Sequence, residues 1–446
     1  MSPDTPVAVT APTPQLSKFD AVMIIVGIVI GGGIFALPPA IAGFSGSFEW
    51  MLAAWVGGAL LSLVGALCYA EMASAFPHAG GDYHFLRRAY GRDLSFFFGW
   101  ARVTVILTGS IALLSYVCGD YLTRVVSLGP YSSAIYAVLV VVVLTAINLV
   151  GLRESSRAQN ILTIVEVGGL VLVVIAGFVA QAPAAAAPAA APSGMPAMFG
   201  LALVFVLFTF GGWNEAAYIS AEVRGGQRAI VTVLVVSICA LAAIYLLVVF
   251  ALVHGLGFDG LKASKAVGAD VMKAAFGPAG EKVIGAMVAV AALTSINATM
   301  LVGARNNYAL GREWPLLAFM SRWQGERNVP VMALLVQAAI ALALVLIAAF
   351  EQGGVRTLVE FTAPVFWFFL TLVGIGFFVL RQRFPQAPRP FKVPLYPLLP
   401  LAFVVTCGYL FYSSVTYAQS KNAIQVSFWV MGVGVIAWIA ARLKKS

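Results

Sequence analysis

VMIIVGIVIGGGIFALPPAI, residues 22–41, is apolar enough to enter a bilayer, yet three consecutive glycines at 31–33 lie near its middle. A glycine costs a helix interior about 1 kcal/mol relative to alanine, and a Pro-Pro pair follows at 38–39. The sequence therefore predicts a membrane helix that is unwound at its centre. Backbone amides freed there must face protein, water or a ligand. The alternative is that Gly27 and Gly31 only let a neighbouring helix approach closely.

The composition predicts a polytopic membrane protein, because 61% of the 446 residues are hydrophobic and 10% are charged. Residues 1–17 lack a basic start and are rich in Pro and Thr, which predicts a disordered cytoplasmic tail and not a signal peptide. The four cysteines lie within apolar runs without metal-ligand spacing, so we expect buried free thiols and neither metal nor cofactor. They are Cys68, Cys118, Cys239 and Cys407.

Twelve apolar segments have roughly the length that spans a bilayer. They are 20–43, 48–75, 94–124, 131–150, 158–181, 199–222, 228–254, 280–308, 329–350, 357–381, 396–418 and 423–442.

The positive charge follows the predicted loops. With the N-terminus inside, 19 of the 27 Lys and Arg residues fall on the cytoplasmic side and 7 on the other. This bias predicts a multi-pass protein of the cytoplasmic membrane with both termini cytoplasmic, embedded in lipid, and it argues against a nucleic-acid partner. Residues 76–93 are predicted to form an amphipathic cytoplasmic helix. Residues 255–278 are predicted to form a small extracellular cap.

A second broken segment is predicted at 205–222, FVLFTFGGWNEAAYISAE, where Gly211 and Gly212 precede a polar pair. The two breaks are 180 residues apart, with an Ala/Pro-rich run at 182–192 between them. If segments 1–5 and 6–10 are repeats, the broken helices are their first members, a pattern that indicates a binding site at the interface of inverted repeats. The alternative is two unrelated packing kinks.

Four motifs resemble the amino acid-polyamine-organocation superfamily, in particular the branch that contains the light chains of heteromeric amino acid transporters. GGGIF at 31–35 is similar to the superfamily's first-segment motif, and FTFGGWNEAAY at 208–218 to its sixth-segment motif. The stretches 69–100 and 296–316 are similar to the region between segments 2 and 3 and to the end of segment 8.

The resemblance implies an all-α membrane protein with twelve transmembrane helices, a five-plus-five inverted repeat and two extra C-terminal helices. The implied divisions are the tail 1–17, the first repeat 18–181, the Ala/Pro-rich outer loop 182–198, the second repeat 199–381, and 382–446 with segments 11 and 12.

The resemblance also implies an amino acid site at the two breaks. Backbone amides of the three glycines would hold the substrate carboxylate, and carbonyls at both breaks would hold its ammonium group. Aromatic side chains would shape the site, and an asparagine would brace the second unwound turn. The implied residues are Val29, Gly31, Gly32, Gly33, Ile34, Phe208, Gly211, Trp213 and Asn214. One departure is Gly32, which stands where relatives often have serine.

Glu166 is a second departure, because several branches carry lysine at this place. An unpaired charge is costly in its apolar surroundings, so we predict that Glu166 couples transport by binding and releasing a proton. The alternatives are a sodium ion held with Thr294 and Ser295, or a structural pair with Arg102. Glu71 and Glu222, near cytoplasmic ends, are expected to pair with arginines.

The function these features indicate is secondary active transport of neutral L-amino acids by alternating access, as proton-coupled symport or exchange. The alternatives are a cationic amino acid or polyamine exchanger, for which Glu215 is the obvious acidic candidate, a sodium-coupled symporter, and a channel or sensor. We expect no enzyme, because the sequence shows no nucleophile with its base, no metal cluster and no phosphate loop.

Overall fold

The structure is a computed structural model that describes residues 17–78, 80–150, 156–180, 195–215, 217, 223–225, 227–322, 330–351, 354–420 and 424–443. Within these ranges the ordered elements are helices and no strand is formed. The predicted tail up to residue 16, the Ala/Pro-rich run 182–192 and Glu222 lie outside the described residues.

The helices follow one another along the whole chain. In order they are α1 (Lys18–Ile30), α2 (Gly33–Ala36), α3 (Pro38–Ser45), α4 (Phe48–Ala75), α5 (Gly81–Tyr90), α6 (Arg92–Ala101), the π-helix η1 (Arg102–Ile106), α7 (Leu107–Val125), α8 (Ser132–Val150), α9 (Ser156–Val179), α10 (Phe199–Thr209), the 3₁₀-helix η2 (Trp213–Glu215), α12 (Gln227–Ala263), α13 (Val267–Glu313), the 3₁₀-helix η3 (Pro315–Ser321), α14 (Val331–Phe350), α15 (Gly354–Arg383), α16 (Leu398–Ser420) and α17 (Ile424–Leu443).

Nine helical stretches in the described residues are long and apolar enough to cross a membrane. Three shorter apolar helices accompany them, at Thr163–Val179, Phe199–Thr209 and Val430–Leu443. The all-α membrane character predicted from the sequence is thus confirmed. The count of twelve spans and the inverted repeat remain predictions.

Both predicted breaks are confirmed. α1 begins at a capping box made by Ser17 and Asp20 and ends at Gly31, whose φ of 20° lies outside the helical region. α10 ends at Thr209, and the chain turns through Gly212, whose φ of 106° favours glycine, before η2. Helical hydrogen bonding therefore stops in the middle of each apolar segment.

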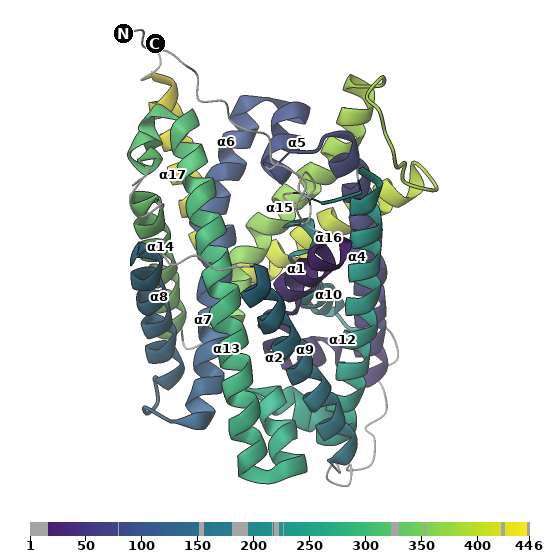
Figure 1. The fold of residues 1–446 in the computed structure, drawn as a ribbon, viewed down its shortest axis with the longest axis vertical. Coiled ribbons are helices and arrows are strands. Elements are labelled where there is room, and N and C mark those ends of the chain that lie inside the picture. Colours follow the sequence, from purple (N-terminus) through teal and green to yellow (C-terminus); the bar gives the residue numbers. More distant parts are fainter. Residues whose placement is uncertain are drawn as a thin grey trace.

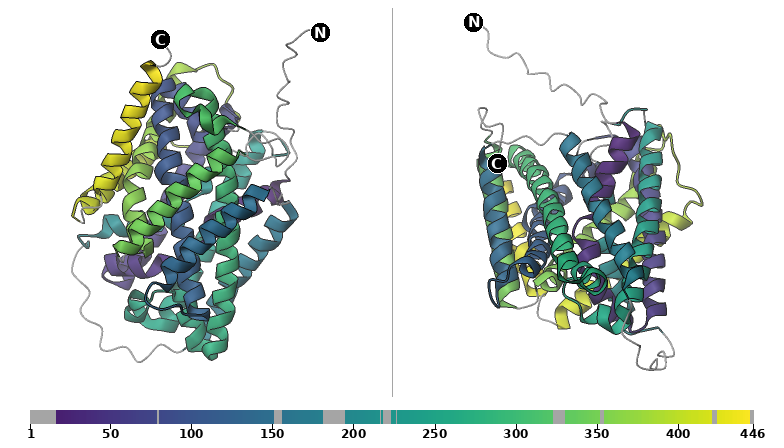
Figure 2. Two further views of the ribbon diagram at one scale, coloured as in Figure 1. Left: turned by 90° about the vertical axis from the view of Figure 1, so that its left-hand side faces the viewer. Right: turned by 60° about the horizontal axis from the view of Figure 1, so that its bottom comes forward.

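The helices run roughly along one axis and form a single helical body (Figure 1). α5 lies at one end of it, and the turn between α12 and α13 lies at the other (Figure 1). α17 runs along the outside (Figure 2). The predicted amphipathic helix is confirmed as α5, which buries Phe85 and Leu86 and exposes Arg87 and Arg88.

The stretch 255–278 is largely helical. α12 continues to Ala263 and α13 begins at Val267, and each is kinked by a glycine with positive φ, Gly257 and Gly277. This segment forms the end of the body opposite α5 (Figure 1).

The cysteine prediction is right for three residues and wrong for one. Cys68, Cys118 and Cys407 are buried free thiols, whereas Cys239 is exposed. Cys239 lies on α12 in a stripe of exposed residues spaced three or four apart, which includes Val236 and Leu247. That spacing is one face of a helix, and here it faces outward.

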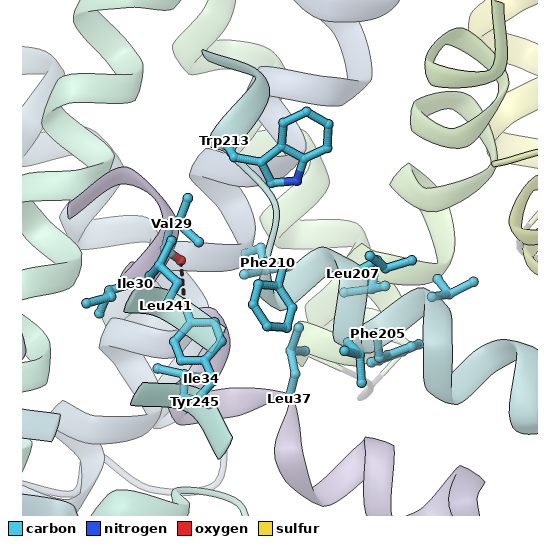
Figure 3. Close-up of a cluster of buried hydrophobic side chains, with 14 of the residues drawn as sticks. Val29, Ile30, Ile34, Leu37, Phe205, Leu207, Phe210, Trp213, Leu241 and Tyr245 are labelled. Atoms are coloured by element: carbon cyan, nitrogen blue, oxygen red, sulfur yellow. Dashed lines mark hydrogen bonds between the residues drawn. The ribbon is translucent and has the colours of Figure 1, made fainter. Parts of the chain in front are cut away.

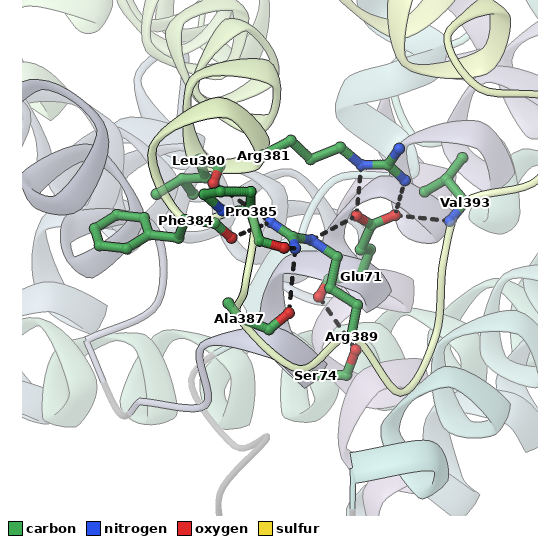
Figure 4. Close-up of polar contacts among 9 residues, drawn as sticks. All are labelled: Glu71, Ser74, Leu380, Arg381, Phe384, Pro385, Ala387, Arg389 and Val393. Atoms are coloured by element: carbon green, nitrogen blue, oxygen red, sulfur yellow. Dashed lines mark hydrogen bonds and ion pairs between the residues drawn. The ribbon is translucent and has the colours of Figure 1, made fainter.

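Glu71 joins α4 to α15 and to the chain that follows α15. Its carboxylate accepts hydrogen bonds from Arg381 at 2.7 and 2.6 Å and from the backbone N–H of Val393 at 2.7 Å. The Arg389 guanidinium lies 3.4 Å away. These groups approach Glu71 from different sides (Figure 4). The expectation that Glu71 pairs with arginine is confirmed.

Candidate functional site

The two breaks touch each other through backbone. A Cβ atom added to Gly33 would lie 3.2 Å from Cα of Thr209, and one added to Gly212 would lie 2.8 Å from the Ile28 side chain. Any side chain larger than hydrogen would push the broken helices apart at these points. The glycines that interrupt the helices are therefore also the residues that let them meet.

Tyr245 of α12 spans this meeting point. Its hydroxyl lies 2.9 Å from the carbonyl oxygen of Val29 (Figure 3). It also lies 3.3 Å from the carbonyl oxygen of Thr209, so its proton serves one carbonyl at each break. The ring is fully buried and packs against Phe210 with centroids 5.1 Å apart. Sequence reasoning missed this residue, although a lone hydroxyl in the apolar run 241–253 was a signal.

Two of the carbonyls predicted to hold an ammonium group, those of Val29 and Phe208, have protein partners in this structure. Val29 accepts from Tyr245, and the Phe208 carbonyl accepts from the backbone N–H of Gly211 at 3.0 Å. A cavity of about 20 Å³ borders Gly211 and Trp213. It is far smaller than the several hundred Å³ of a typical ligand site, so the structure shows the breaks packed together.

The predicted substrate residues gather around the two breaks. Val29 and Ile34 are buried, and a Cβ on Gly32 would lie 3.0 Å from the side chains of Leu114 and Val117 on α7. The aromatic residues pack against other rings: Phe208 is tilted against Phe366 with centroids 5.4 Å apart, and Trp213 packs edge to face with Tyr69 at 5.1 Å. Apart from backbone groups, the surroundings of the breaks are therefore mainly apolar.

Asn214 contacts α5 as well as the break. Its side-chain amide donates to the Asp82 carboxylate at 3.3 Å. Asp82 is 4% exposed, and burial raises its pKa to about 6, while Tyr69, Arg102 and Asn214 oppose this rise. The predicted brace thus extends from η2 to the amphipathic helix.

Arg102 pairs with Glu215, at 2.9 and 3.0 Å from its two carboxylate oxygens. This corrects the alternative in which Arg102 neutralises Glu166. Arg102 opens the π-helix η1, where the extra residue per turn shifts side-chain directions. Neither the π-turn nor the pair was foreseen, because both depend on how segments 3 and 6 pack.

Glu166 and Ser295 lie together, whereas Thr294 does not join them through its hydroxyl. The Ser295 hydroxyl donates to one Glu166 oxygen at 3.4 Å, and the other oxygen has no partner among the described residues. Glu166 is 3% exposed and lies close enough to Tyr245 to interact electrostatically. The Thr294 hydroxyl donates to the Val290 carbonyl of its own helix at 3.1 Å.

A cavity of about 710 Å³ opens among α5, α6, η1 and α13. Its rim carries the Arg87–Glu313 ion pair at 2.7 Å, and Arg102 lines it as well. His78 and His84 stack face to face here with centroids 4.1 Å apart. Burial, helped by the nearby arginines, lowers the pKa of both rings, that of His84 to about 4, so both are neutral at physiological pH.

Comparison with known proteins identifies the family of this chain. The profile of a family described as amino acid permease matches residues 16–439. The chain belongs to the amino acid permease family. The permease is 25% identical to the serine/threonine exchanger SteT of Bacillus subtilis. The match covers 94% of the permease and 95% of SteT. It is 26% identical to the mouse b(0,+)-type amino acid transporter 1, over 89% of the chain and 81% of that protein.

A third relative, the mouse large neutral amino acids transporter small subunit 2, is 27% identical over 94% of the permease and 80% of that protein. The resemblance stated from the four motifs is thereby confirmed.

Proposed function

We propose that this permease is a secondary transporter of neutral amino acids in the cytoplasmic membrane. The observation that carries the proposal is the meeting of two glycine-broken helices, where Gly33 abuts Thr209 in the middle of the helical body. Backbone amides and carbonyls of a broken helix recognise the groups that all α-amino acids share. Two of the named relatives, an exchanger of serine and threonine and a transporter subunit for large neutral amino acids, support the same substrate class.

Binding would separate the two breaks. The amides of Gly31, Gly32 and Gly33 would receive the substrate carboxylate. Its ammonium group would take over the Val29 carbonyl from the Tyr245 hydroxyl, and the carbonyls of Phe208 and Gly211 would complete its shell. Ile34, Phe208 and Trp213 would border the side chain, and Asn214 would hold η2 in place.

The surroundings of the breaks favour neutral over cationic substrates. A cationic amino acid or a polyamine would require a carboxylate that faces the site, and Glu215, the obvious candidate, is held by Arg102 at 2.9 Å. The side chains nearest the breaks are aliphatic and aromatic. A neutral substrate leaves no charge unpaired there.

Glu166 is proposed as the proton-coupling residue. It is buried with a single long hydrogen bond, and it lies near Tyr245, which itself touches the Val29 carbonyl. A change of charge on Glu166 would therefore act on the first break. In this structure the Ser295 hydroxyl donates to Glu166, whereas the Thr294 hydroxyl donates to the Val290 carbonyl of its own helix, so the contact seen at Glu166 is a hydrogen bond from Ser295.

The test of the function is uptake by purified permease in proteoliposomes. We expect saturable uptake of L-alanine, L-serine or L-leucine, and weaker competition by L-arginine and putrescine. Saturable uptake of none of these would overturn the proposed function, and stronger competition by arginine or putrescine would favour the cationic exchanger.

The coupling is tested by Glu166→Gln, which mimics the protonated acid. We expect this variant to lose accumulation driven by an inward proton gradient while it still exchanges internal for external amino acid. Accumulation with an unchanged pH profile would remove Glu166 from the mechanism, and accumulation that requires sodium would favour the ion site.

Main-chain recognition is tested at the glycines. Gly32→Val and Gly33→Val should abolish uptake in protein that still elutes as a single species. The new side chain would meet Leu114 and Val117 in the first variant and the Thr209 backbone in the second. Unchanged apparent affinity in either variant would contradict backbone binding.

The proposed orientation places the α5 end and both termini in the cytoplasm. A cysteine replacing Lys265, in a chain whose exposed Cys239 is changed to alanine, should react with an impermeant maleimide in right-side-out vesicles. Protection of that cysteine from the maleimide would contradict the proposed orientation and favour the opposite one.

A further inference from the structure

One ion pair connects the second break to a continuous membrane helix. Glu215 lies at the end of η2, three residues after Gly212, whose φ of 106° gives the backbone a glycine hinge. Arg102 lies within the stretch Arg92–Val125, which is helical throughout. The pair therefore holds η2, which follows the turn at Gly212, against the long helical stretch Arg92–Val125.

The pair lies between the second break and a cavity at the α5 end. Arg102 lines the cavity of about 710 Å³ at the α5 end, while Glu215 donates its backbone N–H to the Gly212 carbonyl at 3.0 Å, beside the packed breaks. The side chains are 6% exposed for Arg102 and 23% for Glu215. A second link, from Asn214 to Asp82, runs from the same segment to α5. A solute that moved between the breaks and the cavity would have to part η2 from η1.

We propose that the Arg102–Glu215 pair is a gate at the α5 end that the zwitterionic backbone of an amino acid opens. The inference rests on the proposed transport function. An α-amino acid carries the same two charges as the pair. The carboxylate of the amino acid can pair with the Arg102 guanidinium, and its ammonium group can pair with the Glu215 carboxylate. Each charged group of the gate then exchanges its protein partner for one on the substrate.

This exchange of partners makes opening depend on substrate. A ligand shifts a conformational equilibrium only by binding one state better than the other. The zwitterion reaches both charges only when they are apart, so it favours the open gate. Without it, the half-buried pair favours the closed gate. The empty carrier then changes sides slowly, and the permease exchanges amino acids in preference to releasing them without replacement.

The test compares efflux with and without external substrate. Proteoliposomes are loaded with tritiated L-serine, or with whichever neutral amino acid the uptake screen favours, and diluted into buffer with or without unlabelled L-serine. For the wild type we expect external serine to raise the initial efflux rate at least tenfold. Arg102→Gln/Glu215→Gln should release serine into serine-free buffer at a rate near that of wild-type exchange.

A charge swap and a matched pair serve as controls. Arg102→Glu/Glu215→Arg restores the pair in reverse and should regain most of the dependence on external serine. Arg87→Gln breaks the Arg87–Glu313 pair at the cavity rim, where the side chains are 49% and 33% exposed, and should behave as the wild type. A leak in Arg87→Gln equal to that of the double variant would overturn the specific role of the gate.

The remaining outcomes are decisive as well. Wild-type exchange combined with an unstimulated efflux in Arg102→Gln/Glu215→Gln that stays at the wild-type level overturns the gate and leaves the transport function standing. A wild type without saturable uptake of any amino acid overturns the function instead. If the double variant does not elute as a single species, the single variants Arg102→Gln and Glu215→Gln replace it, and wild-type leak rates in both overturn the gate.

Discussion

Glu71 and Glu166 are two carboxylates buried to nearly the same degree, at 2% and 3% exposure, with opposite surroundings. Glu71 receives two hydrogen bonds from Arg381 and one from the Val393 backbone, with Arg389 at 3.4 Å. Glu166 receives one hydrogen bond of 3.4 Å from Ser295. Burial alone therefore does not distinguish a structural carboxylate from one that changes its charge.

The partners make the distinction. Glu71 has cations on two sides, so its charge is compensated and α4 is tied to α15 and to the segment 384–393. Glu166 meets a neutral hydroxyl on α13, and an ionised carboxylate there would lack compensation. Glu71 and its arginines hold α4 and α15 together. Among the described residues Glu166 contacts no such compensating cation, as the proposed role of binding and releasing a proton requires.

The largest expected effect is the loss of stability in Glu71→Gln. Arg381, whose side chain is 20% exposed, and Arg389, at 9%, would lose their counter-charge, which costs about 3–5 kcal/mol when one partner of a buried pair is removed. The same change at Glu166 keeps the neutral form and its hydrogen bond, so we expect a change within about 1 kcal/mol. Thermal unfolding of both variants in detergent measures the contrast. Equal losses of stability in Glu71→Gln and Glu166→Gln would contradict the distinction between a charge-compensated carboxylate at Glu71 and an uncompensated one at Glu166.

Asp82 is a third buried carboxylate to compare with Glu71 and Glu166, and its contribution to stability depends on pH. Because burial raises its pKa from 3.8 to about 6, its contribution to stability is complete below pH 3.8 and is lost as pH rises to about 6. The difference amounts to about 3 kcal/mol at 1.36 kcal/mol per tenfold change in proton affinity. Asp82→Asn should flatten the stability between pH 4 and pH 6 relative to the wild type. An unaltered slope in that window would exclude Asp82 as its source.

Tyr245 tests whether the neighbourhood of Glu166 acts on the first break. Tyr245→Phe removes the proton shared by the Val29 and Thr209 carbonyls, a hydrogen bond worth about 1 kcal/mol. We expect an approximately fivefold change in the apparent KM for uptake, with folding retained. An unchanged apparent KM would show that the Tyr245 hydroxyl does not influence uptake through the breaks.

The smallest effect is expected for Ser295→Ala. The hydrogen bond that it removes is long, at 3.4 Å, so stability should change by less than about 1 kcal/mol. Unfolding as severe as in Glu71→Gln would show that Ser295 supports α9 as firmly as the arginines support α4.

The predicted helix breaks were correct, and the assignment of substrate-binding residues to them stays a prediction. Consecutive glycines at 31–33 and at 211–212 predicted both breaks from local sequence, although the glycine pairs 57–58 and 168–169 lie within the continuous helices α4 and α9. The partners of Arg102, Asp82 and Tyr245 did not follow. Apart from Thr209, which is 36 residues from Tyr245, these partners lie more than one hundred residues away in the chain, and several carboxylates were equally available to Arg102 by sequence.

The sequence by itself determined the membrane class, the apolar segments, the two breaks, the amphipathic helix α5 and the family, because hydropathy, glycine content and short motifs act over a few turns of chain. Only the tertiary structure decided that Gly33 abuts Thr209, that Tyr245 joins both breaks, and that Glu215 and not Glu166 neutralises Arg102. The physical reason is that a buried charge or hydroxyl takes the partner that helix packing brings within about 3 Å, and packing is a property of the whole chain.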